Sequence, residues 1–455
     1  MFAFYDLETT GTSPAFDQPL QFAAILTDDD LTPVDSINIR CRLSPHILPA
    51  PWALAVTGVM PDMLTDPTLP TLFEFMQTLS DLIARWGPAT WTGYNSIAFD
   101  EEMLRQALYQ NLHPSPYITQ IDGNDRMDIM KVVYATWVLA KDALTWPTDD
   151  NGRHSFKLDR VAPANGFTQH DAHDALGDVE ATIHIARLIR DRAPDVWSES
   201  LRNRSKHDVN ALLETGHVLQ LIERFGAAPP RAYIGAYTGR STQNQNAVGF
   251  MDLEMVDPVE LVGLSDESIA AAVSGSPKQI RTVTVNKHPN LFSVNDIAPD
   301  ASARAQDLAS MTDLHDRVGQ ALANRFIDQE GSEHVEQRIY AGFYSHGDKR
   351  LLSQFQMASW GQRINLMNSF EDERLQWLAQ RQLYNNRPDL MDDTVGSTWE
   401  ARIMERWWSG DDKAPWTTLD QVDQQLAEIE EQGSMSAAAI LMLKNYYAAL
   451  KNLPR

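Results

Sequence analysis

The sequence is almost without cysteine: Cys41 is the single one among 455 residues. This excludes an internal disulfide framework and a cysteine-based zinc site. Cys41 follows the alternating stretch Ile37-Asn38-Ile39-Arg40, so we expect it to be a buried strand residue.

Long hydrophobic runs are also missing, and no stretch approaches the roughly 20 apolar residues that a membrane-spanning helix needs. The chain enters a strand pattern at Phe2, so no signal peptide is expected, and a cytoplasmic protein is predicted. With 43% hydrophobic residues, a chain of this length is expected to form two to four domains.

Basic residues are few, 38 Lys and Arg against 62 Asp and Glu, and the net charge is −24. Nucleic-acid-binding proteins usually carry a basic excess. Binding depends, however, on the local potential along a groove rather than on the total charge. Local basic clusters do occur, for example at Arg202, Arg204, Lys206 and His207.

Acidic residues occur at three informative places, of which the first is the pair Asp6 and Glu8. They end an apolar run that begins at Phe2 and predicts a buried strand. Residues two apart project from the same face of a strand. Two neighbouring buried carboxylates repel each other, and a divalent cation between them removes that cost. A solvated strand end is the simpler interpretation of this pair taken alone.

The second acidic place is Asp100. Residues 91–94 predict the end of another buried strand, and a helical pattern begins at Phe99. Asn95 or Ser96 is expected to cap that helix. Asp100 would then lie in the first helical turn at the carboxyl edge of a strand, where compensation of the helix dipole is the alternative role.

The third acidic place is Asp178, near the start of a long amphipathic helix that is expected to end before Pro194. His173 precedes Asp178 by five residues, which does not put both on one helix face. They can converge if His173 lies on the loop before the helix, where the positive helix end favours a neutral base. His170 is close in sequence but lacks this spacing.

Together, Asp6, Glu8, Asp100 and Asp178 with His173 resemble the catalytic set of the DEDDh 3′→5′ exonucleases. The motifs of that superfamily read Asp-x-Glu, Asn-x(2–3)-Phe-Asp and His-x-Ala-x-x-Asp, and all three occur here in order. The segment Val56–Val59 also matches. Further segments resemble the bacterial exodeoxyribonuclease I family, namely 11–25, 203–207, 285–289 and 340–345.

This resemblance implies an α/β fold with an RNase H-like exonuclease domain, a domain containing an SH3-like β-barrel, and a helical C-terminal domain. Their expected bounds are 1–195, 196–335 and 336–455. Within the last two parts, the pattern predicts a helix over 209–225, strands over 231–237, 247–253 and 279–285, and helices over 299–330, 375–383, 397–408, 419–431 and 436–450. Ser397 is expected to cap the helix that it begins. The C-terminal part could alternatively be an independent protein-binding module.

The resemblance implies a metal-dependent 3′→5′ exonuclease that degrades single-stranded DNA processively to 5′-mononucleotides in DNA repair and recombination. Two Mg²⁺ ions are expected, with Mn²⁺ able to substitute. Asp6 would bridge them, Glu8 and Asp178 would complete one site, Asp100 would assist at the other, and His173 would be the general base.

The partners that the resemblance implies are single-stranded DNA and the acidic C-terminal tail of single-stranded DNA-binding protein; a monomer without membrane attachment is expected. Substrate contacts are expected from Thr9, Thr10, Asn95, Phe99, Arg202, Arg204 and Lys206. The aromatic residues Phe343, Tyr344 and Trp407 could stack on bases, although such residues more often form cores.

Two alternative functions remain open. A 3′→5′ exoribonuclease of the ribonuclease T or oligoribonuclease type would use the same chemistry, but such chains are usually much shorter. A noncatalytic nucleic-acid-binding scaffold would keep the fold without the chemistry, and the intact acidic set with His173 argues against it.

Overall fold

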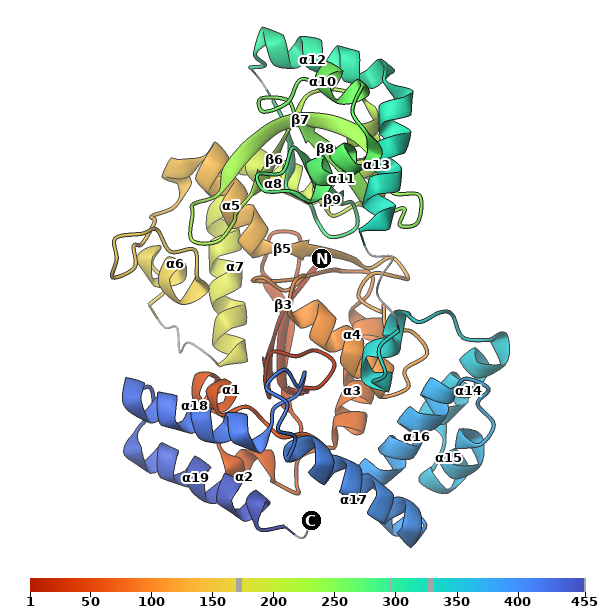
Figure 1. The fold of residues 1–455 in the computed structure, drawn as a ribbon. Coiled ribbons are helices and arrows are strands. Elements are labelled where there is room, and N and C mark those ends of the chain that lie inside the picture. Colours follow the sequence, from red (N-terminus) through yellow and green to blue (C-terminus); the bar gives the residue numbers. More distant parts are fainter. Residues whose placement is uncertain (169–173, 295, 326–330, 454–455) are drawn as a thin grey trace.

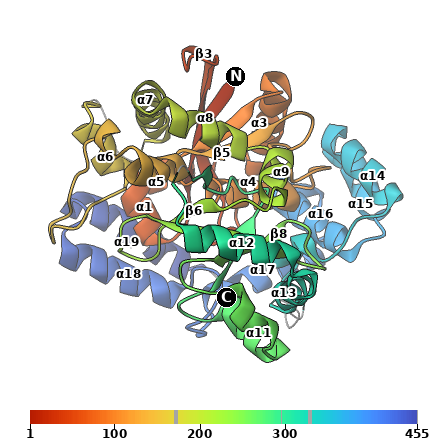
Figure 2. The same ribbon diagram turned by 90° about the horizontal axis from the view of Figure 1, so that it is seen from above.

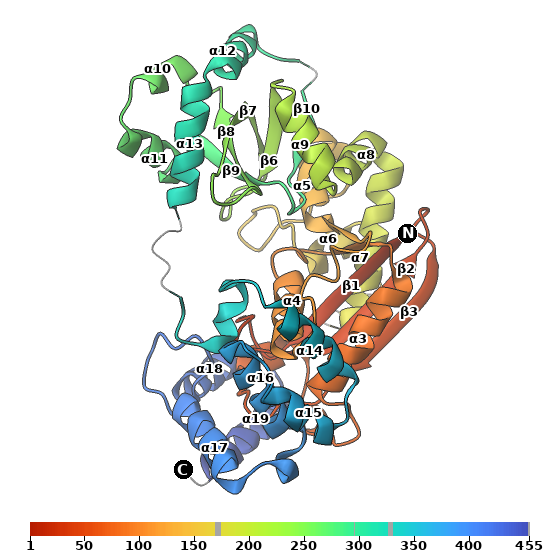
Figure 3. The ribbon, with the colours of Figure 1, turned by 90° about the vertical axis from the view of Figure 1, so that its right-hand side faces the viewer.

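The computed structural model describes residues 1–168, 174–294, 296–325 and 331–453. A mixed sheet with helices on both faces occupies the middle of the molecule. A second sheet lies at one end and a group of helices at the other (Figure 1, Figure 3). Among the described residues, no helix is both long and apolar enough to cross a bilayer.

The central sheet has five strands in the order β3-β2-β1-β4-β5. They are β1 (Phe2–Thr9), β2 (Pro19–Thr27), β3 (Pro33–Arg40), β4 (Thr90–Gly93) and β5 (Asp125–Asp128). The middle strand β1 runs antiparallel to β2 and parallel to β4. The buried strands expected at the first two acidic motifs are thereby confirmed.

Side chains of β1 alternate between two hydrophobic cores, as the period of a strand requires. Phe2 and Phe4 pack into one core, and Ala3, Tyr5 and Leu7 pack into the other. The first core is closed by α5 (Ile129–Leu139) and α7 (Ala175–Arg192), the second by α3 (Leu72–Trp86) and α4 (Asp100–Gln110). By the same alternation, Asp6 and Glu8 lie on the face that α7 covers.

The remaining helices of this central part are short: α1 (Pro51–Thr57), α2 (Pro61–Leu64), α6 (Leu158–Ala164) and the 3-10 helix η1 (Lys141–Ala143). The helix expected after Phe99 is confirmed as α4. Its expected cap at Asn95 or Ser96 is wrong, because Phe99 occupies the N-cap position and its side chain makes no capping hydrogen bond. Ser96 contributes only its carbonyl, which accepts from the Glu101 amide at 2.8 Å. Cys41 is buried as expected, although it lies one residue beyond β3.

The second sheet is antiparallel, with the order β10-β6-β7-β8-β9. Its strands are β6 (Leu219–Glu223), β7 (Arg231–Arg240), β8 (Ala247–Asp252), β9 (Ile280–Thr284) and β10 (Leu291–Ser293). The helices around it are α8 (Pro194–Asn203), α9 (Lys206–Glu214), α10 (Pro258–Val262), α11 (Asp266–Ser274), α12 (Pro299–Ser310) and α13 (Thr312–Asn324). The pairings among the described strands leave β9 and β10 as edges, so the SH3-like barrel stays a prediction.

The helix expected over residues 209–225 is correct only in its first part. Helix α9 ends at Glu214, and Gly216 follows with a left-handed φ of 69° that breaks the helix. Residues 219–223 then form β6, in which Leu219, Leu221 and Ile222 are buried and the polar residues Gln220 and Glu223 are partly exposed. The three strands expected in this part are confirmed as β7, β8 and β9, whereas the very short β10 was not expected.

The C-terminal part is helical, as expected. It contains α14 (His346–Met357), α15 (Trp360–Met367), α16 (Glu373–Asn386), α17 (Asp393–Trp407), α18 (Leu419–Gln432), α19 (Ala437–Lys451) and the 3-10 helices η2 (Val335–Tyr340) and η3 (Pro388–Leu390). The cap expected at Ser397 is wrong, since α17 begins one turn earlier, where the Asp392 side chain accepts from the Thr394 amide.

These C-terminal helices flank the central sheet on two sides, with α14–α16 on one and α18 and α19 on the other (Figure 2). Two hydrophobic cores join them to the central part. In one core, Leu54 of α1 packs with Trp407 and Val422; in the other, Phe73 of α3 packs with Phe355. The C-terminal part is therefore not an independent module.

Candidate active site

Three carboxylates meet where β1 ends and α7 begins. Asp6 and Glu8 are carried by β1, and Asp178 lies in the first turn of α7. One carboxylate oxygen from each can be chosen so that all three lie within 4.8 Å of one another. Among the described residues this is the one group of three or more potential metal ligands.

Asp100 approaches the same edge of the sheet from α4 but lies outside that 4.8 Å group. Its Oδ1 accepts a hydrogen bond from the Leu7 amide at 3.2 Å, which ties it to the strand segment between Asp6 and Glu8. The path into α4 is tight: a Cβ on Gly93 would stand 2.5 Å from the Tyr5 carbonyl, so only glycine fits there.

Burial raises the pKa values of Asp6, Glu8 and Asp100 above their ordinary values. Burial raises the pKa of Glu8 to about 8, with added repulsion from Asp178 and Asp100. Burial, followed by the charges of Asp100, Glu8 and Asp178, raises the pKa of Asp6 well above its ordinary value. Burial also raises the pKa of Asp100 to about 8, although the Leu7 amide acts in the opposite direction.

This donor set fits a hard divalent cation. Carboxylate oxygens are the ligands that Mg²⁺ and Mn²⁺ prefer, and the three side chains come from rigid elements. Without a counter-charge, Asp6, Glu8 and Asp100 are ionised only at a cost, which is the origin of their raised pKa values. A bound cation would reverse that cost, so the arrangement can hold a metal ion and activate water on it.

The expected general base His173, and His170 with it, lie outside the described residues. The first described residue after them is Asp174, the N-cap position of α7, four residues before Asp178. Its Oδ1 accepts from Gln21 Nε2 at 3.1 Å and lies 3.9 Å from Arg40 Nη2.

Gln21, Arg40 and Asp174 were missed by the sequence analysis as neighbours of the site. Gln21 and Arg40 follow from strand register, because Glu8 pairs with Gln21 on β2 and Gln21 pairs with Arg40 on β3. Asp174 is the N-cap residue of α7. Arg40 lowers the pKa of Glu8, against the larger opposing effect of burial, while Asp174 raises it. Arg40 and Asp174 therefore influence the ionisation of Glu8 from one side of the carboxylate group.

Of the expected substrate-binding residues, four lie at this edge of the sheet: Thr9, Thr10, Asn95 and Phe99. The two threonine hydroxyls have intramolecular partners, since Thr9 Oγ1 donates to the Gly11 carbonyl at 2.8 Å and Thr10 Oγ1 to Asp17 Oδ1 at 2.9 Å. They hold the loop that follows β1. Asn95 has a left-handed φ of 67° in the turn before α4.

The other three, Arg202, Arg204 and Lys206, are not brought to the carboxylates. Arg204 contacts Asp125 at 3.1 Å and donates to Thr90 Oγ1 at 2.8 Å. Thr90 pairs with Phe2, four residues and roughly 13 Å along the strand from Asp6. This basic cluster thus lies at the opposite edge of the central sheet, where an acidic neighbour already compensates Arg204.

The three aromatic residues considered for base stacking differ in exposure. Phe343 is 99% exposed, whereas Trp407 is buried in the core that joins α17 to α1. Tyr344 is partly buried against the core around Phe355. Phe343 is therefore the one of the three whose ring faces solvent.

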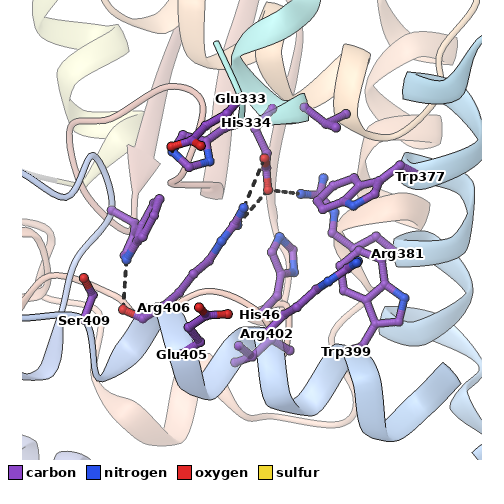
Figure 4. Close-up of a pocket in the computed structure, with 14 residues that line it drawn as sticks. His46, Glu333, His334, Trp377, Arg381, Trp399, Arg402, Glu405, Arg406 and Ser409 are labelled. Carbon is purple, nitrogen blue, oxygen red and sulfur yellow. Dashed lines mark hydrogen bonds and ion pairs between the residues drawn. The ribbon is translucent and has the colours of Figure 1, made fainter. Parts of the chain in front are cut away.

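A cavity of about 440 Å³ lies among the C-terminal helices and contains none of these carboxylates. Three arginines, three glutamates and three tryptophans are among its lining residues (Figure 4). Glu336 accepts from both Arg381, at 3.2 Å, and Arg406, at 2.7 Å. Burial alone would raise the pKa of Glu336, but the two guanidinium groups outweigh it and lower that pKa. The ion pairs of Glu336 with Arg381 and Arg406 link η2 to α16 and α17.

Comparison with protein families gives two matches. A family described as "Exonuclease" matches residues 3–186, and one described as "Exonuclease I C-terminal domain" matches residues 333–453. Exodeoxyribonuclease I of Haemophilus influenzae is 30% identical over 410 residues, which cover 82% of this chain and 84% of that protein. Exodeoxyribonuclease I of Escherichia coli is 27% identical over 436 residues, covering 88% of each.

Solved structures give the same relationship. Exonuclease I from Methylocaldum szegediense superimposes with a TM-score of 0.82 at 27% identity, covering 98% of this chain and 99% of that chain. E. coli exonuclease I in complex with a dT13 oligonucleotide has a TM-score of 0.82 at 25% identity, with 100% and 99% coverage. A structure of SSB/exonuclease I with the inhibitor CFAM has a TM-score of 0.80 at 25% identity, with 98% and 99% coverage.

Proposed function

The chain belongs to the exodeoxyribonuclease I family, and on that premise we propose that its carboxylate group is the metal site of a 3′→5′ exonuclease acting on single-stranded DNA. The protein is a nuclease, a hydrolase of phosphodiester bonds. The observation that carries the assignment of the site is the convergence of Asp6, Glu8 and Asp178 at one end of β1.

The proposed roles of the carboxylates are supported by the positions of their side chains, and that of His173, which lies outside the described residues, rests on the family motif. Asp6, Glu8, Asp100 and Asp178 would hold two Mg²⁺ ions, with Mn²⁺ as a substitute, and His173 would take the proton of the attacking water. Bound metal supplies water activation and stabilisation of the departing 3′ oxygen. The Leu7 amide keeps Asp100 in place, and Arg40 with Asp174 adjusts the charge beside Glu8.

The proposed substrate is single-stranded DNA, because a relative of similar length has been solved with a dT13 oligonucleotide. Release of 5′-mononucleotides, processive action and a role in DNA repair and recombination are part of the proposal. The proposed protein partner is SSB, with which a relative has been solved. Thr9, Thr10, Asn95 and Phe99 are proposed to face the 3′-terminal nucleotide, since they lie at the edge that carries the carboxylates.

We also propose three structural parts, with bounds at 1–195, 196–335 and 336–455. Two hydrophobic cores support the second part, because all of their members come from residues 209–322. The third part would be a docked extension, since it shares its cores with the first.

The deciding experiment is digestion of one single-stranded oligonucleotide, labelled either at its 3′ or at its 5′ end, with and without Mg²⁺. A 3′→5′ exonuclease releases the 3′ label as a mononucleotide at once and shortens the 5′-labelled strand stepwise, only with metal. Immediate release of the 5′ label instead, or cleavage that persists in a chelator, would contradict the proposal.

The alternative substrate is RNA, and a matched RNA oligonucleotide in the same assay separates the two. Faster turnover of the RNA would favour an exoribonuclease. Binding of DNA with no hydrolysis at any metal concentration would favour the noncatalytic scaffold.

A further inference from the structure

One contact between the second sheet and the exonuclease part is made by residues 286–290, which we call the docking loop and which lie between β9 and β10. Arg126 of β5 donates to the Asn286 carbonyl at 2.9 Å, and Lys131 of α5 donates to the His288 carbonyl at 3.2 Å. Asn290 donates back to the Lys131 carbonyl at 2.8 Å. The docking loop therefore touches β5 and α5, the strand and the helix that follow α4 along the chain.

His288 is the innermost residue of the docking loop, with 1% of its surface exposed. Its Nε2 lies 3.0 Å from the Ser200 carbonyl, and its Nδ1 lies 3.2 Å from the Asp128 amide nitrogen. A carbonyl can only accept and an amide N–H can only donate, so Nε2 carries the proton and Nδ1 is the acceptor. Burial, with the nearby charge of Lys131, lowers the pKa of His288 to about 3, which keeps the ring neutral.

Asp128, whose amide His288 fixes, holds the turn that leads to Asp100. Its side chain is fully buried, and Oδ1 accepts from the Asn95 amide at 3.0 Å. Its Oδ2 accepts from the Ile97 amide at 3.3 Å. The turn needs such support because Asn95 has a left-handed φ, which an L-residue adopts only at some cost.

A second connection runs from the docking loop to the residue after Asp100. Arg126, which is held by the Asn286 carbonyl, donates to Glu101 Oε2 at 2.9 Å. Glu101 is buried and also accepts from the Tyr5 hydroxyl at 2.9 Å. Both connections end within five residues of Asp100, on the turn and the first helical turn that position its carboxylate.

We propose that His288 is a positioning residue for Asp100: by fixing Asp128, it transmits the docking of the second sheet to the turn at residues 95–99. The inference rests on the proposed role of Asp100 as a metal ligand. According to this inference, His288, a residue of the second part of the chain, affects catalysis although it contacts none of the proposed metal ligands. Loss of the hydrogen bond between His288 and Asp128 would then change the metal site without changing any ligand.

Two substitutions of His288 separate this role from simple support of the fold. In His288→Asn the amide oxygen can take the place of Nδ1, so the acceptor for the Asp128 amide is kept and the donor to Ser200 is lost. In His288→Gln the side-chain amide reaches the place of Nε2, so the donor is kept and the acceptor is lost. Both variants introduce one amide into the same buried position, and each is the matched control of the other.

We expect His288→Gln to lower kcat about tenfold to a hundredfold and to raise the Mg²⁺ concentration for half-maximal activity, since small displacements of catalytic groups have effects of this size. We expect His288→Asn to stay within about threefold of the unsubstituted protein on both measures. Hydrogen–deuterium exchange of the peptide covering residues 94–99 should speed up in His288→Gln alone. Melting temperatures of both variants report any loss of stability separately.

Two further variants keep the test decisive. Asp128→Asn weakens the hydrogen bonds from the Asp128 side chain to the turn, without a substitution in the docking loop. It should lower kcat as His288→Gln is expected to do, and it can replace His288→Gln in the test if that variant fails to fold. Asn290→Ala removes a docking contact that does not lead to Asp100 and should leave kcat unchanged. Equal kcat values in His288→Gln, His288→Asn and Asp128→Asn would overturn the inference. If Asp100→Asn keeps full activity, the proposed ligand set fails instead, and the two failures are thereby distinguishable.

Discussion

The amide nitrogen of Leu7 donates a hydrogen bond to Oδ1 of Asp100 at 3.2 Å. Leu7 stands between Asp6 and Glu8 in β1, and its own side chain points to the opposite face, into the core with α3 and α4. The strand therefore presents two carboxylates with its side chains and holds a third with its backbone. This arrangement fixes Asp100 relative to Asp6 through the backbone of β1.

Replacing Asp6 by asparagine should abolish cleavage while leaving the fold and DNA binding intact. The amide has nearly the same shape but no charge, and metal-dependent stabilisation worth several kcal/mol would be lost. We expect turnover to fall by about 10³-fold or more, measured with labelled single-stranded DNA. Asp30→Asn, in the exposed turn between β2 and β3, is the matched control and should be fully active. Near-normal turnover of Asp6→Asn at saturating Mg²⁺ would refute the assignment.

Metal binding should compete with protons around pH 8. The pKa values of Glu8 and Asp100 are both raised to about 8 without a cation, so below that pH each must lose a proton before metal binds. The apparent dissociation constant for Mg²⁺ should therefore fall as the pH rises from 6 towards 8, and level off above it. Titration calorimetry at several pH values measures this slope, which Glu8→Gln should reduce. A dissociation constant independent of pH would show that these groups are already ionised.

The two histidines that precede α7 should behave differently. His173→Ala should lower turnover by about 10²–10⁴-fold, the usual contribution of a general base, whereas His170→Ala should have little effect. Because the two lie three residues apart in the same segment, each controls for local disturbance by the other. A large loss of turnover in His170→Ala alone would mean that the five-residue spacing to Asp178 does not identify the general base.

His288 should make the protein less stable in acid. Its pKa falls from an ordinary 6.5 to about 3 on folding, so between these values the unfolded chain binds a proton that the folded chain does not. The contribution of this group to stability is present above pH 6.5 and is lost as the pH falls towards 3, by about 1.4 kcal/mol per pH unit. Urea unfolding between pH 4 and 7 should show a shallower dependence in His288→Asn. An identical slope in both proteins would contradict the buried neutral ring.

The sequence was sufficient wherever local periodicity determines geometry. Alternation along β1 placed Asp6 and Glu8 on one face, and the amphipathic pattern from Ala175 to Arg192 located the helix that carries Asp178. The apolar stripe after Phe99 likewise located α4. These features depend on contacts within a few residues, which a pattern can reveal.

The sequence was insufficient wherever partners are distant. The pairing of Asp128 with His288 spans 160 residues, and neither residue carries a local signal of it. Gln21 and Arg40 adjoin the site only through the register of β2 and β3. The basic cluster at Arg204 is a second example, because its proximity in sequence to the exonuclease part does not determine which edge of the sheet it occupies.

The hydrophobic cores that the C-terminal helices share with the central part affect the thermal unfolding of the chain. Leu54 and Phe73 of the central part are buried against Trp407, Val422 and Phe355, so detaching the helices would expose large apolar surfaces on both sides. The central and C-terminal parts should therefore unfold cooperatively, giving one calorimetric endotherm rather than two. In a chain cut after residue 335, we expect the remainder to aggregate rather than to yield a stable, separately folding nuclease.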